Sequence, residues 1–118
     1  MENKQGKIEE KFMYPEFQYL AEKHPELYAH FISLGRYPIE KGKFLDLKTK
    51  LLIPMVILAH RGQIQGVATH IRRALGLGMT EEEILEAFLV ALLPGGAPTL
   101  VNGLRALLEA KKEPSGNR

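Results

Sequence analysis

Residues 63–84 have the sequence QIQGVATHIRRALGLGMTEEEI, and this stretch decides the fold class. The apolar residues of its first half recur one helical turn apart, at Ile64, Val67, Ala68, Ile71 and Leu75. This spacing is typical of an amphipathic helix with one buried face. The second half pairs Thr80 with Glu83, a capping box in which each side chain bonds the other's backbone N–H. Glycines separate the halves, so the stretch predicts two consecutive helices.

The sequence on either side continues the helical pattern. Residues 47–61 are almost continuously apolar, lack a period of two and are too long for a strand, so they predict a buried helix that Asp46 caps. A second helix that is apolar on nearly every side is predicted over residues 81–93, and residues 36–44 are expected to form a loop. In total the chain predicts six helices, over residues 15–23, 25–34, 47–61, 63–75, 81–93 and from Pro98 onward.

Charge and composition exclude several classes of protein. The chain has 16 basic and 14 acidic residues and a formal charge of +2, so no nucleic-acid partner is expected. No apolar run approaches the roughly 20 residues that span a bilayer, so no membrane partner is expected either. The chain contains no cysteine, which excludes thiol catalysis and thiolate metal ligands and favours a reducing, cytoplasmic location. We expect no cofactor and no metal ion.

The length of the chain predicts a single domain over residues 15–110. A flexible segment is expected at residues 1–14 and a disordered tail at residues 111–118. The two most apolar helices present a packing problem, because a chain of 118 residues has little interior in which to bury both. We therefore expect further copies of the chain to cover them, as a homo-oligomer. The alternative is that both helices are central in a small bundle.

Three segments together resemble the carboxymuconolactone decarboxylase / AhpD-like superfamily. They are LDLKTKLLI at residues 45–53, THIRRALGLGMTEEEI at residues 69–84, and GGAP at residues 95–98, and the similarity extends over residues 45–108. The resemblance implies an all-α, AhpD-like subunit of about six helices that assembles into a trimeric or hexameric ring.

The resemblance also implies where the superfamily's chemistry would lie. The AhpD-like branch uses a glutamate, a Cys-x-x-Cys pair and a histidine as a proton relay around a redox disulfide. Counted from His70, the cysteines fall on Gln63 and Gly66 and the glutamate falls on Leu51. Only His70 matches, so a thiol peroxidase or disulfide reductase mechanism is excluded. The decarboxylase branch lacks the cysteines and keeps the histidine, but often has glutamate at the position of Gly66.

Helical geometry places His70 independently of the resemblance. At about 100° per residue, His70 lies about 120° from the centre of the buried face, on the same flank as Gln63 and Gly66. Gly66 has no side chain and leaves a dent beside the imidazole. His70 is therefore either an acid/base or anion-binding residue, or a flank histidine bonded to a carbonyl or buried at a subunit contact. The predicted lining of a pocket beside it is Gln63, Gly66, Arg73, His60 and Leu51.

Other polar residues leave two interpretations open. His60 either meets His70 at a metal ion or faces solvent at a helix end, and no carboxylate accompanies the two histidines at ligand spacing. Arg73 either pairs with a ligand carboxylate, or it is solvated or forms an ion pair between subunits. Glu86 is either a relay acid or a structural residue. In the second case it lies on the exposed side of its helix or forms a salt bridge between subunits of an oligomer.

These observations support two functions and leave open whether the chain is an enzyme. The first is a thiol-free family member that binds a small organic acid or lactone near His70. If it is an enzyme, it is a carboxymuconolactone decarboxylase-like lyase that uses His70 for cofactor-free proton transfer or decarboxylation. The second is a non-catalytic oligomeric scaffold or partner subunit that retains the fold.

Overall fold

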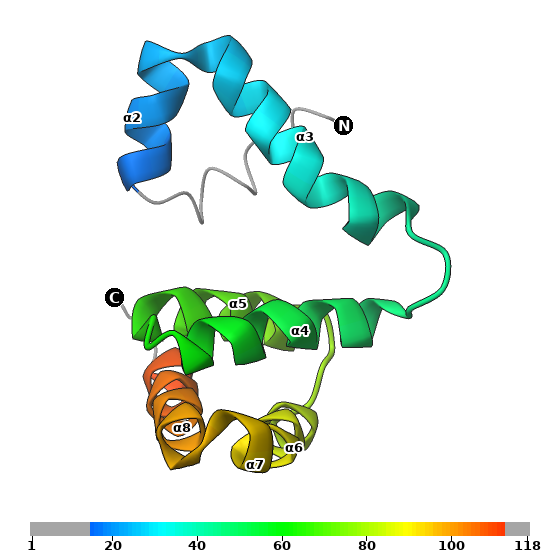
Figure 1. The fold of residues 1–118 in the computed structure, drawn as a ribbon, viewed down its shortest axis with the longest axis vertical. Helices are drawn as coiled ribbons and strands as arrows, with labels where there is room; N and C mark the ends of the chain where they lie inside the picture. Colours follow the sequence, from blue (N-terminus) through cyan, green and yellow to red (C-terminus); the bar gives the residue numbers. More distant parts are fainter. Residues whose placement is uncertain (1–14, 113–118) are drawn as a thin grey trace. The chain divides into compact units, whose positions relative to one another are not determined.

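A computed structural model of the chain describes residues 15–112, which contain seven helices and no β-strand (Figure 1). The helices are α2 (Pro15–Lys23), α3 (Pro25–Lys41), α4 (Leu47–His60), α5 (Ile64–Gly76), α6 (Glu81–Val90), α7 (Leu92–Gly95) and α8 (Ala97–Lys111). The all-α prediction is confirmed, with one helix more than expected. The segment at residues 1–14 and most of the predicted tail, residues 113–118, lie outside the described residues.

The chain divides into two compact units between Phe44 and Leu45. In the first unit α2 packs against α3, with the rings of Phe17 and Phe31 5.5 Å apart, and neither helix contains a buried residue. The second unit contains α4 to α8 and all the buried residues of the described chain. The single domain predicted over residues 15–110 stays a prediction.

The core of the second unit lies where α4, α5, α6 and α8 meet. As predicted, α5 turns one apolar face to this core, which buries Val67, Ala68, Ile71 and Ala74. The fully buried ring of Phe88 comes from α6 and occupies the space beside Gly103 of α8. A Cβ atom at Gly103 would lie only 2.5 Å from the Phe88 ring, so α6 and α8 approach closely because residue 103 has no side chain.

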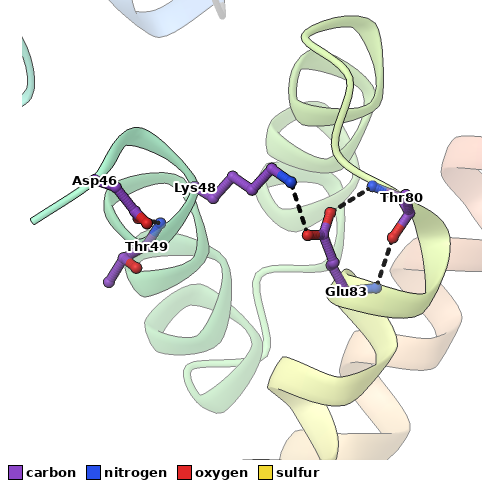
Figure 2. A network of polar contacts seen from close by, with 5 residues as sticks. All are labelled: Asp46, Lys48, Thr49, Thr80 and Glu83. Carbon is purple, nitrogen blue, oxygen red and sulfur yellow. Dashed lines mark hydrogen bonds and ion pairs between the residues drawn. The ribbon is translucent and has the colours of Figure 1, made fainter.

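Local side-chain caps begin α4 and α6, as the sequence predicts. The backbone N–H of Thr49 donates to Asp46 Oδ1 at 2.9 Å. At α6, Glu83 N–H donates to Thr80 Oγ1 at 3.1 Å, and Thr80 N–H donates to Glu83 Oε1 at 2.8 Å. Lys48 Nζ donates to the other oxygen of the same carboxylate at 2.8 Å (Figure 2). Glu83 therefore both caps α6 and links the start of α6 to the start of α4.

The capping box gives a first testable prediction. Thr80→Ala removes one acceptor at the start of α6 and should lower the free energy of unfolding by about 1 kcal/mol. Glu83→Gln is the matched control, because glutamine still bonds the Thr80 backbone N–H but loses the ion pair with Lys48. Urea unfolding followed by circular dichroism measures both. An unchanged midpoint for Thr80→Ala would contradict the assigned cap.

Helix α3 is longer than the sequence predicts. Gly35 does not end it, and the expected loop over residues 36–44 is wrong for its first part, because the helix continues to Lys41 with Pro38 inside. A proline in a helix removes one backbone bond, and Arg36 Nε and Glu40 Oε2 lie 3.9 Å apart across the weakened turn.

Helix α6 is shorter than predicted, and a separate turn of helix follows it. The helix expected over residues 81–93 ends at Val90, because Pro94 has no N–H for the Val90 carbonyl and its ring clashes with that carbonyl. The chain continues as α7 and breaks at Gly96, whose φ is 87°. Lys111, which the sequence analysis assigned to the tail, is instead the last residue of α8, and its Nζ lies 3.0 Å from Glu81.

Candidate functional site

His70 is a partly buried residue of α5, next to the fully buried Ile71. Its ring nitrogens have no hydrogen-bond partner among residues 15–112. Burial, and to a lesser extent the positive charge of Arg73, lowers the pKa of His70 below its ordinary value. The imidazole is therefore neutral at neutral pH. One ring nitrogen carries no hydrogen, so it can accept a proton or a hydrogen bond without a prior deprotonation.

The residues predicted to line a pocket beside His70 lie in different environments. Gln63 is exposed and precedes the first turn of α5, whereas Gly66 and Arg73 are partly buried in the same helix. Leu51, which we predicted at the position of the family's glutamate, is a core residue of α4 that is 9% exposed. The structure places Arg73 within electrostatic range of His70. The proposed lining by the other residues stays a prediction.

His60 is bonded to a residue that the sequence analysis did not identify. Its Nδ1 lies 3.0 Å from Oγ1 of Thr99, a residue of α8 that is 1% exposed. The Thr99 hydroxyl donates its one hydrogen to the Gly95 carbonyl at 2.9 Å. Oγ1 therefore accepts from Nδ1–H, and in the neutral ring the other nitrogen, Nε2, is left as an acceptor.

A second hydrogen bond joins α8 to the end of α4 that carries His60. The Asn102 side chain donates to the Ala59 carbonyl at 2.9 Å, so α8 contacts the last turn of α4 at two points. The sequence gives no local signal for either bond, because the partners lie 39 and 43 residues apart. No group of three or more histidine, aspartate or glutamate side chains that could hold a metal ion occurs in the described part of the chain.

A groove of about 610 Å³ lies between α4 and α6 in the second unit. Its apolar lining includes Leu52, Ile53, Val56 and Ile57 from α4, with Ala87 and Val90 from α6. The Lys48–Glu83 ion pair is at one end of it. Glu86 also lines the groove and is exposed, and it forms no ion pair with any residue in the range 15–112. None of the residues predicted to surround His70 lines this groove.

Comparison with known proteins identifies the family. Residues 25–109 match the carboxymuconolactone decarboxylase family. The chain belongs to this family. The chain is also 34% identical over 89 residues to the uncharacterized protein MJ0742 of Methanocaldococcus jannaschii, covering 75% of this chain and 85% of that protein. It is 28% identical over 85 residues to the uncharacterized protein MJ1511 of the same organism, covering 72% and 78%.

This carboxymuconolactone decarboxylase family chain retains the helical fold without the thiols of the AhpD-like branch. The resemblance drawn from residues 45–108 is confirmed, and the family match begins earlier, within α3. The chain has no cysteine, so the Cys-x-x-Cys pair of the AhpD-like relay is missing. No helix within residues 15–112 is long and apolar enough to cross a membrane.

The lowered pKa of His70 predicts a pH dependence of stability. A histidine whose pKa is lower in the folded than in the unfolded chain binds protons preferentially in the unfolded chain. Its contribution is therefore present above about pH 6.5, the ordinary histidine pKa, and is lost as the pH falls below it. Wild type should lose stability relative to His70→Gln as the pH falls below about 6.5. The free energy of unfolding of both proteins would be measured in urea at each pH. If it changes with pH by the same amount in both, the lowered pKa of His70 is contradicted.

Proposed function

We propose that this chain binds a small organic acid or lactone at His70 and exchanges a proton with it, with no cofactor. The observation that carries the proposal is the state of the imidazole. It is partly buried, has no hydrogen-bond partner among the described residues, and lies within range of the Arg73 charge. Buried polar groups in proteins are nearly always bonded, so an unpaired one calls for a partner from outside the described chain.

The chemistry of the two side chains suits such a ligand. A neutral imidazole can remove a proton from carbon beside a carbonyl group, forming an N–H bond as the C–H bond breaks, and can return that proton to another carbon. In a decarboxylation, the neutral imidazole first takes the proton of the ligand's carboxyl group. The C–C bond to the leaving CO₂ then breaks, and the imidazolium returns that proton to the carbon that keeps the electron pair. The guanidinium of Arg73 attracts a carboxylate, which favours an acidic ligand over a neutral one.

A ligand screen tests this function. Wild type and His70→Ala would be compared by calorimetry and by turnover against lactones, keto acids and aromatic acids, with His30→Ala as a control at an exposed histidine. We expect His70→Ala alone to lose binding or turnover. Arg73→Gln should weaken the binding of acids more than that of lactones. If wild type and His70→Ala behave identically across the panel, the proposal is wrong.

A second function, a non-catalytic oligomeric module, is favoured by a separate observation. Large apolar side chains of the second unit are strongly exposed, including Val90 at 72% and Leu93 at 92%. Such surfaces are typical of contacts between proteins. We therefore propose that the chain assembles with further copies of itself, whether or not His70 is catalytic. Light scattering of wild type measures the assembly, and a monomer at high concentration would contradict it.

A further inference from the structure

We propose that the α4–α6 groove binds helix α3 of a second copy of the chain. This inference gives the proposed self-association a defined interface, and it is independent of the chemistry proposed at His70. It rests on the size of the apolar surface around the groove, on the apolar face of α3, on the charges beside each, and on the linker that joins α3 to α4.

The apolar surface around the groove is larger than the groove itself. Apolar residues line it along both helices, and of these Ile57 is 52% exposed and Val90 is 72% exposed. Leu93, which precedes the lining residue Pro94, is 92% exposed. A ligand that filled only the groove would leave much of this surface in water. Two neighbouring helices with an apolar channel between them are a common site for an amphipathic third helix.

Helix α3 has an apolar face of the right kind and length. It has 17 residues, none of them buried, and exposes Leu27, Phe31 and Leu34 at positions i, i+4 and i+7. These side chains are 56%, 47% and 74% exposed. They extend over about 10 Å of helix, and the groove-lining residues of α4, from Lys48 to Ile57, extend over about 14 Å. The ring of Phe17 contacts Phe31 and leaves it half exposed, so α2 covers only part of this face.

The charges beside the two surfaces are complementary. At about 100° per residue, Lys41 lies on one flank of the apolar face of α3. His30 lies on the same flank, and its Nε2 is 4.0 Å from Glu26 Oε2. Lys41 forms no ion pair with any residue in the range 15–112, and Glu86 beside the groove forms none either. Docking of α3 would bring the Lys41 charge to the Glu86 side of the groove, which fixes orientation more than it adds affinity.

The linker between α3 and α4 favours exchange between copies. Gly42 and Asp46, at its two ends, both have extended backbones, with ψ angles of 140° and 168°. The chain bends at Phe44 and Leu45 between them, so neither helix continues through the linker. A short linker of this kind can let a helix occupy the equivalent site on a neighbouring copy.

Disulfide trapping tests the proposal, because the natural chain has no cysteine to interfere. Full-length Leu34→Cys protein, carrying a mass tag, would be mixed with full-length Val90→Cys protein and gently oxidised. We expect a mixed disulfide between the two chains as the main product, several-fold above either disulfide between like chains. Ser33→Cys replaces Leu34→Cys in the matched control, because Ser33 is exposed on the same helix outside the apolar face.

Each other result of the trapping experiment would overturn the proposal. Equal yields from Leu34→Cys and Ser33→Cys would show that α3 has no preferred site in the groove. A dominant disulfide between two Val90→Cys chains would show that the groove faces another groove. In the double variant Leu34→Cys/Val90→Cys, a disulfide confined to single chains would show that α3 occupies the groove of its own copy.

A charge substitution provides a second measurement. Leu34→Glu places a carboxylate in the apolar face of α3, and it should lower the mass measured by light scattering while the helical circular dichroism stays unchanged. The fold should tolerate the change because Leu34 is 74% exposed. Ser33→Glu adds the same charge beside it and should leave the mass unchanged. An unaltered mass for Leu34→Glu would contradict the interface.

Discussion

Replacing Gly103 with alanine should destabilise the second unit, although the same change stabilises most helices. Alanine is favoured over glycine inside a helix by about 0.5–1 kcal/mol. At this position the new Cβ would lie 2.5, 2.6 and 2.7 Å from three ring atoms of Phe88. That ring is completely buried and cannot move into solvent. Overpacking of this kind costs about 1–3 kcal/mol, so the loss should exceed the gain in helix propensity.

A double-mutant cycle separates the steric clash from other causes. Phe88→Leu alone should also destabilise the unit, because it leaves a cavity beside Gly103. The double variant Gly103→Ala/Phe88→Leu should lose less stability than the sum of the two single losses, because the methyl group occupies part of the vacated space. Urea unfolding of the four proteins measures the coupling. Strictly additive losses, or a more stable Gly103→Ala, would contradict the packing of α6 on α8.

The features predictable from sequence are those that neighbouring residues determine. Asp46 and Thr80 cap their helices through residues three positions away, so the start of each helix is visible in the sequence. The buried face of α5 follows from the spacing of its apolar residues. The helix-end errors in α3 and α6 came from glycine and proline. Gly35 and Pro38 weaken α3 without ending it, whereas Pro94 ends α6 one turn before its own position.

Much of the candidate site could not be predicted, because it depends on contacts distant in sequence. The groove requires α4 and α6 to lie side by side, and the Lys48–Glu83 ion pair that links them joins residues 35 positions apart. The helical period predicted the position of His70 on its helix. It also predicted that Arg73, three residues further on, lies one turn away. The partner of His60 could not be predicted, because Thr99 resembles any small residue at the start of a helix.

The bond between Thr99 and His60 predicts the second large effect. Thr99→Val has nearly the same shape but has no hydroxyl, so it leaves the Gly95 carbonyl without this donor and His60 without this acceptor. His60 is exposed and can bond water instead, so the loss comes from the partly buried Gly95 carbonyl. Leaving a buried polar group unpaired costs about 1–3 kcal/mol, and urea unfolding should show a loss near the lower end of this range. Thr99→Ser, which keeps the hydroxyl, should lose less. His60→Ala should also lose less than Thr99→Val, because the bond from Thr99 to Gly95 remains.

Imidazole ¹⁵N spectra would report the same bond directly. The Thr99 hydroxyl has one hydrogen and donates it to Gly95, so wild-type His60 in its neutral form should carry its proton on Nδ1. In Thr99→Val this constraint is absent, and the ring should return towards the Nε2–H form that solvated histidines favour. A wild-type spectrum with the proton on Nε2 would show that Thr99 donates to His60 instead. The unprotonated nitrogen, Nδ1, would then face Thr99. His60 would offer Nε2–H to any ligand as a donor rather than act as a base.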